Sequence, residues 1–394
     1  MRKLIKNRNF VYWLNLYIWL IIVLQEAKMK NEAITERQGA ILIILFIIGS
    51  TIITGTGGQA RQDAWIAIII AISCSTILLL MFSRILSLYP GKDLFDILQI
   101  VVGKLIGKFI GILMIWFAFH LGTLVMRNLS DFTNTLTLTD TPVVLPMLLF
   151  SIILIWGLKE GIEVFGRWGE FFIWFVILTW SFYSMLAISQ MDINRLKPIL
   201  SNGFPPLIKG VFSSFSFPFG EIVIFTMVFS NISKAKNYNK TFLVGLGLGG
   251  LIIFLGTLRN LLILGSYRIS MVYFPSVLAI SLIHIGLLLQ RLEVGILPVL
   301  LICSYAKVII CLFAICNGIS KVFNLNDYRF IATPVTLLML NFSIFIYKNT
   351  MEMAAFAFDI WPYYSFPFEV IIPLIVFILA EIKHRKSSTI LDTK

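Results

Sequence analysis

Apolar stretches of about 20 residues recur along nearly the whole chain, and charged residues are largely confined to the short breaks between them. A helix of this length crosses the hydrocarbon core of a bilayer with its backbone polar groups bonded within the segment. Only 13% of the 394 residues are charged, against roughly 25% in a soluble domain. No stretch remains that could form a separate aqueous core. The sequence therefore predicts an all-α integral membrane protein with one membrane domain.

The apolar runs after Met29 predict ten spanning helices. A shorter helical stretch over 274–290, which carries His284, is predicted to lie at the membrane surface or to dip into it. The ten crossings are expected at 39–58, 64–88, 104–129, 142–158, 165–189, 207–230, 240–265, 293–322, 329–347 and 361–382.

The distribution of Lys and Arg between the loops predicts the orientation of the bundle. Cytoplasmic loops of membrane proteins are enriched in Lys and Arg. In this chain most Lys and Arg fall in cytoplasmic loops if both ends of the ten-helix domain, 29–386, face the cytoplasm together with the tail, 387–394. The formal net charge of +12 is spread over short loops rather than gathered in one patch. It therefore indicates topology and contacts with anionic membrane lipids, not nucleic acid.

Residues 1–28 do not fit this orientation. A basic stretch precedes an apolar one, as in a signal peptide, but no small-residue cleavage site follows. An eleventh crossing here would place the basic residues outside, against the usual charge bias. From Met29 the chain reads as an ordinary start, in which Thr35 can cap the helix that follows. We therefore interpret residues 1–28 as an upstream extension or an interfacial anchor.

The first crossing is interrupted by small and polar residues at Gly49, Ser50 and Thr51. Irregular backbone at membrane depth persists only where protein or a watery cavity satisfies its polar groups. The cluster therefore predicts an unwound point that presents backbone donors and acceptors to a ligand. Close helix packing through small residues is the alternative.

A second interruption is expected in the sixth crossing, where Pro218 and Gly220 stand among serines and phenylalanines. Proline removes a helical hydrogen bond and clashes with the preceding turn, so it predicts a kink or an unwound segment. The two interrupted crossings, the first and the sixth, are five places apart in the order of helices. This is the spacing of the first helices in two inverted five-helix repeats.

Two charged residues lie within predicted crossings, Glu221 in the sixth and Lys307 in the eighth. A charge at this depth is costly and usually faces a partner or a cavity. Our hypothesis is that both line one polar cavity, with Lys307 at a position that a sodium ion fills in related folds. A purely structural ion pair and a snorkelling lysine are the alternatives.

Further candidates for the cavity wall are Phe119 and Thr123 on the third crossing and Ser304 on the eighth, although a serine within a span commonly bonds its own helix. The sequence contains no GxxxxGK[ST], HExxH or GxSxG motif and no His/Cys cluster, so it predicts neither an enzyme nor a bound cofactor. The GLGLGG run that begins at Gly245 has no strand before it. It predicts close helix packing.

Several short motifs, in this order and spacing, resemble one known family. They are ITERQ before the first crossing, QARQDAW after its break, YPGKDLFDIL after the second crossing, FPFGE in the sixth, YFPS after the seventh and RLE at the start of the eighth. Over roughly residues 29–386 the chain resembles the B subunits of spore germinant receptors, which lie within the amino acid-polyamine-organocation transporter superfamily.

The resemblance implies a ten-helix fold like that of the bacterial leucine transporter, with a nutrient such as an amino acid held by crossings 1, 3, 6 and 8. It also implies a complex in the inner spore membrane with a larger A subunit and a C-subunit lipoprotein, in which ligand binding triggers ion release and germination. Three glycines cluster after the first break, which leaves the unwound residues open. The implied pocket residues are Gly49, Ser50, Thr51, Phe119, Thr123, Ser214, Phe217, Gly220 and Ser304.

Two functions share this predicted cavity, a nutrient-sensing receptor subunit and a secondary amino-acid permease coupled to H⁺ or Na⁺. In either, the carboxylate of a zwitterionic ligand would lie near free N–H groups at a half-helix N-terminus and its ammonium near carbonyls at a half-helix C-terminus. Fold alone does not separate the two functions.

Overall fold

The computed structural model describes residues 33–136, 140–232, 238–283 and 292–392, and in these ranges the chain is helical without a β-sheet. Residues 1–28 and His284 fall outside the described ranges, so the expectations about them stay predictions. The α-helices are α2 (Glu36–Ile48), α3 (Thr51–Thr54), α4 (Ala64–Leu88), α5 (Leu94–Val101), α6 (Lys104–Leu136), α7 (Val144–Glu160), α8 (Ile162–Leu186), α9 (Phe204–Ser214), α10 (Tyr238–Met271), α11 (Pro275–Ser281), α12 (Leu297–Phe323), α13 (Ala332–Phe345), α14 (Thr350–Ala355), α15 (Trp361–Phe366) and α16 (Ile372–Asp392).

Seven helical segments of the described chain are long and apolar enough to cross a membrane. The other three predicted crossings, the first, fourth and ninth, correspond to shorter helices, namely the α2–α3 pair, α7 and α13. Large apolar side chains such as Ile77, Trp156 and Phe171 are exposed on outward faces, as expected where lipid is the surrounding solvent. The chain is an all-helical integral membrane protein, and the count of ten crossings stays a prediction.

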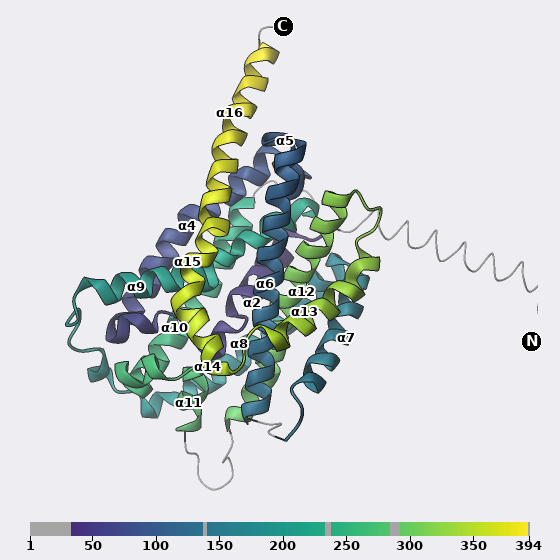
Figure 1. Ribbon diagram of the computed structural model, residues 1–394. Coiled ribbons are helices and arrows are strands. Elements are labelled where there is room, and N and C mark those ends of the chain that lie inside the picture. The colour runs from purple at the N-terminus through teal and green to yellow at the C-terminus, as the bar shows by residue number, and fades with distance from the viewer. Residues whose placement is uncertain (1–32, 137–139, 233–237, 284–291, 393–394) are drawn as a thin grey trace, which may run out of the picture.

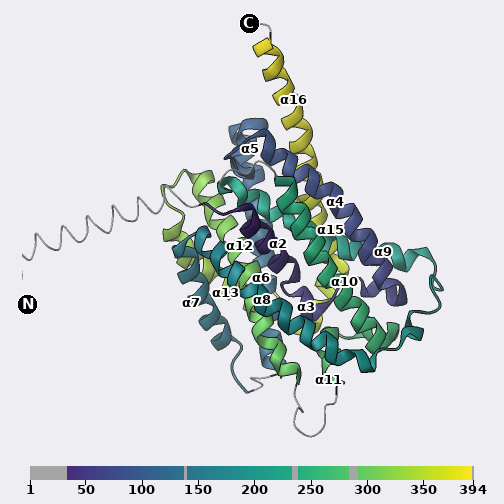
Figure 2. The ribbon, with the colours of Figure 1, turned by 180° about the vertical axis from the view of Figure 1, so that it is seen from behind.

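Helix α2 lies inside the bundle and carries the first half of the site. Thr35 caps it as predicted, because its side chain accepts from the backbone N–H of Gln38 while the Gln38 side chain accepts from the N–H of Thr35. Every residue from Gln38 to Ile48 is buried. Helices α10, α8 and α12 pack around it (Figures 1 and 2).

The glycine run of α10 is a helix-packing surface, as predicted. A Cβ atom on Gly245 would meet Ile43 Cβ at 2.7 Å, and one on Gly249 would meet Ile47 Cδ1 at 2.8 Å. Helix α10 and helix α2 can therefore approach each other closely only because these side chains are absent.

The two ends of the bundle differ. Helix α5 and the projecting C-terminal half of α16 lie at one end, whereas α11 and α14 lie at the other (Figure 1). Helix α10 is interrupted at Gly265, where φ is 76°, close to the predicted end of the seventh crossing. Of the stretch predicted over 274–290, the structure describes residues 274–283, which include α11.

Candidate functional site

The first crossing is broken at Gly49 and Ser50. Helix α2 ends at Ile48 and α3 begins at Thr51. Gly49 has φ 26°, which disfavours a side chain. A Cβ atom there would also meet Lys307 Cδ at 2.7 Å. The predicted interruption is confirmed, and it brings the backbone against a lysine from another crossing.

The sixth crossing is broken at Phe217 and Pro218. Helix α9 runs into the π segment η4 (Phe215–Phe219), within which Phe217 is extended, with φ −129° and ψ 112°, and the 3-10 helix η5 (Gly220–Met227) continues the crossing. Pro218 cannot donate a backbone hydrogen bond. This interruption is also confirmed.

The two interrupted crossings are joined by hydrogen bonds. The Thr56 hydroxyl, which lies in the irregular stretch after α3, donates to the Phe217 carbonyl at 2.8 Å and lies 3.1 Å from the Ser214 hydroxyl. The Thr56 hydroxyl therefore satisfies a carbonyl that the break removes from the helical ladder. The two breaks lie side by side.

Glu221 and Lys307 form a fully buried ion pair between the two breaks. Lys307 Nζ lies 2.5 Å from Glu221 Oε2, and both side chains have 0% exposure. The ammonium also lies 4.9 Å from the ring centroid of Phe46 and 4.8 Å from that of Phe217, within the range of cation–π attraction. The lysine does not snorkel to the membrane surface, and it supplies positive charge at the C-terminal end of α2, where a cation is favoured.

An inner cavity of about 30 Å³ separates the breaks, a volume close to that of one water molecule. It is lined by Ser50, Thr54, Leu121, Leu124, Val125, Asn128, Phe217, Glu221, Tyr273, Met353, Ala357, Phe358 and Trp361. Both broken crossings, α6 and the chain around α14 and α15 therefore meet at one enclosed point.

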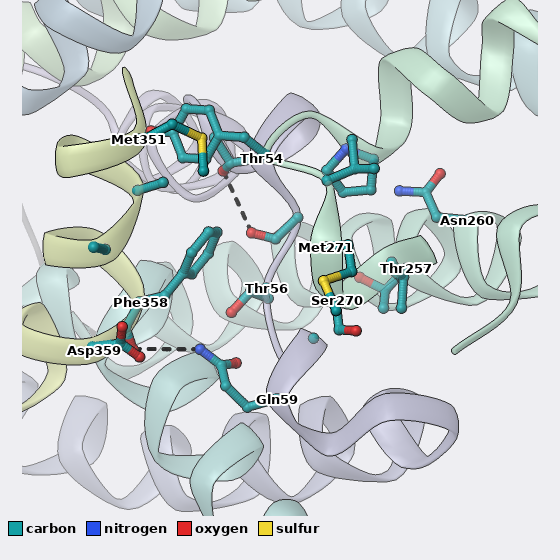
Figure 3. A pocket seen from close by; sticks show the side chains of 18 residues that line it. Thr54, Thr56, Gln59, Thr257, Asn260, Ser270, Met271, Met351, Phe358 and Asp359 are labelled. Carbon is teal, nitrogen blue, oxygen red and sulfur yellow. Dashed lines mark hydrogen bonds between the residues drawn. The ribbon is translucent and has the colours of Figure 1, made fainter. Parts of the chain in front are cut away.

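A larger cavity of about 340 Å³, which we call the vestibule, adjoins it at the α11–α14 end (Figure 3). Thr54, Tyr273 and Phe358 line both cavities. The rings of Tyr273 and Phe358 meet edge to face with centroids 6.0 Å apart, and the Tyr273 hydroxyl donates to Asn128 Oδ1. Burial raises the pKa of Tyr273, so this phenol stays protonated. The two rings form a partition between vestibule and inner cavity.

The structure brings five of the predicted residues to the ion pair or the inner cavity. Ser50, Phe217 and Glu221 line the cavity, Lys307 pairs with Glu221, and Gly49 contacts Lys307. The hydroxyl of Ser50 has no hydrogen-bond partner among the described residues. A polar ligand could occupy this vacant bonding position.

The remaining predicted residues lie around this centre without lining the inner cavity, and their roles stay predictions. Thr51 lines a small separate cavity beside Trp180, and Phe119 packs against Trp116 and Phe342. Three hydroxyls and one glycine complete the set. Thr123 donates to the Phe119 carbonyl on its own helix, Ser214 lies against Thr56, Ser304 is buried, and Gly220 lies against Glu369.

Sequence reasoning missed the residues that complete the site. Glu369 stands inside the last predicted crossing, and its charge alone was a signal. Thr54 and Thr56 belong to the same polar run as Gly49. Tyr273 stands out in the sequence only as part of the YFPS motif, and nothing in the apolar pattern indicates that it faces a cavity.

Comparison with known proteins fits this architecture. Residues 33–352 match the profile of a family described as spore germination protein. Spore germination protein KB of Bacillus subtilis (strain 168) is 28% identical over 362 residues, covering 91% of this chain and 97% of the relative. Spore germination protein XB of Bacillus anthracis is 25% identical and covers 64% of this chain and 72% of the relative.

A solved structure shows the same fold. Mhp1, a nucleobase-cation-symport-1 family transporter in a closed conformation with bromovinylhydantoin bound, superposes with a TM-score of 0.63 at 14% identity, over 86% of this chain and 77% of its own. This is the leucine-transporter-like fold that the family resemblance implied, with the first and sixth crossings broken. The family profile covers most of the chain, which therefore belongs to the spore germination protein family.

Proposed function

We propose that this protein is the nutrient-sensing subunit of a spore germination receptor complex and that a small germinant, such as an amino acid, binds in the inner cavity. The observation that carries the proposal is the meeting of both broken crossings at one enclosed point lined by Ser50, Phe217 and Glu221. Membership of the family supplies the physiological setting.

The chemistry around the inner cavity suits a zwitterion. Glu221 Oε1 has no hydrogen bond of ordinary geometry among the described residues, although Trp361 lies near it, so it can receive the ligand's ammonium beside the carbonyls that end α2. The first N–H groups of α3 and η5 have no acceptor within their own helices and suit its carboxylate. Leu121, Val125 and Met353 offer an apolar wall for its side chain.

In this proposal the ligand arrives through the vestibule and displaces the Tyr273–Phe358 partition, because the inner cavity has room for about one water. Binding energy then favours a rearranged bundle over the closed one. The proposed readers of that change are a germinant receptor A subunit and a C-subunit lipoprotein in the inner spore membrane, with both ends of the core in the cytoplasm.

Thermal unfolding of the purified full-length chain with panels of amino acids, sugars and nucleosides tests the proposal. We expect a subset of amino acids to raise the unfolding temperature, and Ser50→Ala to weaken apparent affinity about fivefold through loss of one hydrogen bond. Ser151→Ala is the matched control, because that buried hydroxyl bonds its own helix at the Met147 carbonyl. Equal effects of the two substitutions, or no stabilising compound, would contradict the proposal.

A secondary permease is the second candidate, favoured by the fold shared with a transporter. Both functions use the same cavity, so the separating measurement is flux. If the chain is a sensor, proteoliposomes that contain it alone bind the radiolabelled germinant without accumulating it. Saturable accumulation that Ser50→Ala weakens and Ser151→Ala preserves would identify a permease instead.

A further inference from the structure

Glu369 is a second buried carboxyl next to the ion pair. It lies on the π segment η10 (Pro367–Ile371) within the last predicted crossing, with 0% exposure. A Cβ atom on Gly220 would meet its carboxyl carbon at 2.6 Å. The hydroxyls of Ser216 and Ser365 lie near it, yet neither carboxyl oxygen has a hydrogen bond of ordinary geometry among the described residues.

The charges around Glu369 do not balance if every group is ionised. Glu221 and Lys307 are the charged groups that act on it electrostatically, which gives two carboxyls and one ammonium, all at 0% exposure. An unpaired carboxylate in such a place costs several kcal/mol or more. The Lys307 ammonium is already used, since it lies 2.5 Å from Glu221.

No second cation is available from the described elements packed against this group. Cys311 on α12 is the other titratable side chain close to the ion pair, and a thiol carries no positive charge. His120 on α6 lies beyond Trp361 and Tyr364, enclosed by aromatic rings, with neither nitrogen bonded to a described residue. An imidazolium there would be a buried charge without a partner.

We propose that Glu369, Glu221 and Lys307 form a binding site for one proton in the core of the membrane, with the proton held by the two carboxyls. Protonation leaves one carboxylate for one ammonium and removes the uncompensated charge. A protonated Glu369 also gains an O–H donor, and its neighbours Glu221 Oε1 and Ser365 Oγ are acceptors without a hydrogen bond of ordinary geometry among the described residues. Because Glu221 also lines the inner cavity, the bound proton can exchange with whatever occupies that cavity.

Infrared spectroscopy of the purified full-length chain at neutral pH tests the site through the carbonyl stretch of protonated carboxylic acids. Difference spectra against wild type should show loss of one such group in Glu369→Gln and also in Glu221→Gln, because either change leaves one carboxylate for Lys307. Lys307→Met should instead gain one protonated carboxylic acid, because without the ammonium both buried carboxyls are neutral. Glu381→Gln is the matched control and should lose none, because this carboxylate lies midway along α16 and pairs with Arg84 at 2.6 Å.

Glutamine has nearly the shape of a protonated glutamic acid, so the Glu369→Gln protein should fold. If Lys307→Met does not fold, the dependence of unfolding temperature on pH decides. A native state that holds one extra proton loses stability as the pH rises, so this decline should be shallower in Glu369→Gln than in wild type and Glu381→Gln. Parallel declines in all three, or an unchanged carboxylic acid band in Glu369→Gln, would overturn the proton site. Neither readout requires the germinant.

Discussion

At the scale of single residues, the site depends on two glycines that let buried charges touch the backbone. Gly49 lies against the Lys307 side chain and Gly220 lies against the Glu369 carboxyl. A Cβ atom on either glycine would lie closer than 3 Å to the charged side chain, so any other residue there would push that side chain away. The positions of the buried charges and of the two breaks are therefore fixed by the same residues.

We expect Gly49→Ala to destabilise the protein by about 3 kcal/mol, from backbone strain and from overpacking against Lys307 and the Phe46 carbonyl. Gly91→Ala is the matched control, because Gly91 also has positive φ, 75°, but nothing lies within 4 Å of the place that its Cβ atom would take. Backbone strain alone should lower the free energy of unfolding of Gly91→Ala by about 1 kcal/mol. Thermal unfolding measures both variants, and equal losses would show that the Lys307 contact is unimportant.

At the scale of elements, the short helix α5 is tied to the eighth crossing by a polar cluster. Asp93 caps α5 by accepting from the Asp96 N–H, and it also accepts from Asn317 Nδ2 at 2.8 Å. Its carboxylate lies 2.6 Å from Lys321 Nζ, which also pairs with Asp96. Burial raises the pKa of Asp93 even beside Lys321. The YPGKDLFDIL motif thus fastens one end of the bundle.

Asp93→Ala should therefore cost about 2 kcal/mol, through loss of the cap and of two further polar contacts. Asp96→Ala removes only the more exposed of the two carboxylates that pair with Lys321, so it should lower the free energy of unfolding by about 0.5 kcal/mol. Thermal unfolding together with protease cleavage near α5 would measure the difference. If Asp96→Ala were as damaging as Asp93→Ala, the cap would not be the main contribution.

The breaks could be predicted from sequence because Gly49 and Pro218 act on their own backbone. The direction in which the other side chains point could not be predicted from the sequence. The spans are apolar nearly all round, so a sequence pattern does not reveal which side of α6 meets the cavity. The sequence predicts Phe119 and Thr123 there, whereas Leu121 and Val125 line the inner cavity. The charge of Glu369 marks it as unusual within a crossing, but its place beside the ion pair required knowledge of how the last crossing packs against the sixth.

At the scale of the whole molecule, the two cavities differ about tenfold in volume: the vestibule measures about 340 Å³ and the inner cavity about 30 Å³. The partition between them is held by one hydrogen bond, from Tyr273 to Asn128, and by the ring contact of Tyr273 with Phe358. A further bond, from Gln59 Nε2 to the Phe358 carbonyl at 3.4 Å, links the partition to the segment after the first break.

Tyr273→Phe should open this partition more often, because it removes a hydrogen bond worth about 1 kcal/mol and keeps the ring. Labelling of Ser50→Cys by a small thiol reagent should then accelerate about fivefold. Tyr267→Phe is the control, since that tyrosine of α10 is 74% exposed. An unchanged labelling rate in the Tyr273→Phe background would place the barrier elsewhere.

The ammonium between the two breaks belongs to Lys307 and is covalently tethered to α12. A charge that is part of the polypeptide cannot be released on the far side of the membrane, so a gradient of free metal cations cannot be used through that position. In our proposal, the exchangeable charge beside the neighbouring cavity is then the proton held by Glu221 and Glu369. If the chain is the sensor proposed above, occupancy of its cavity follows the concentration of nutrient outside and not a stored gradient of metal cations.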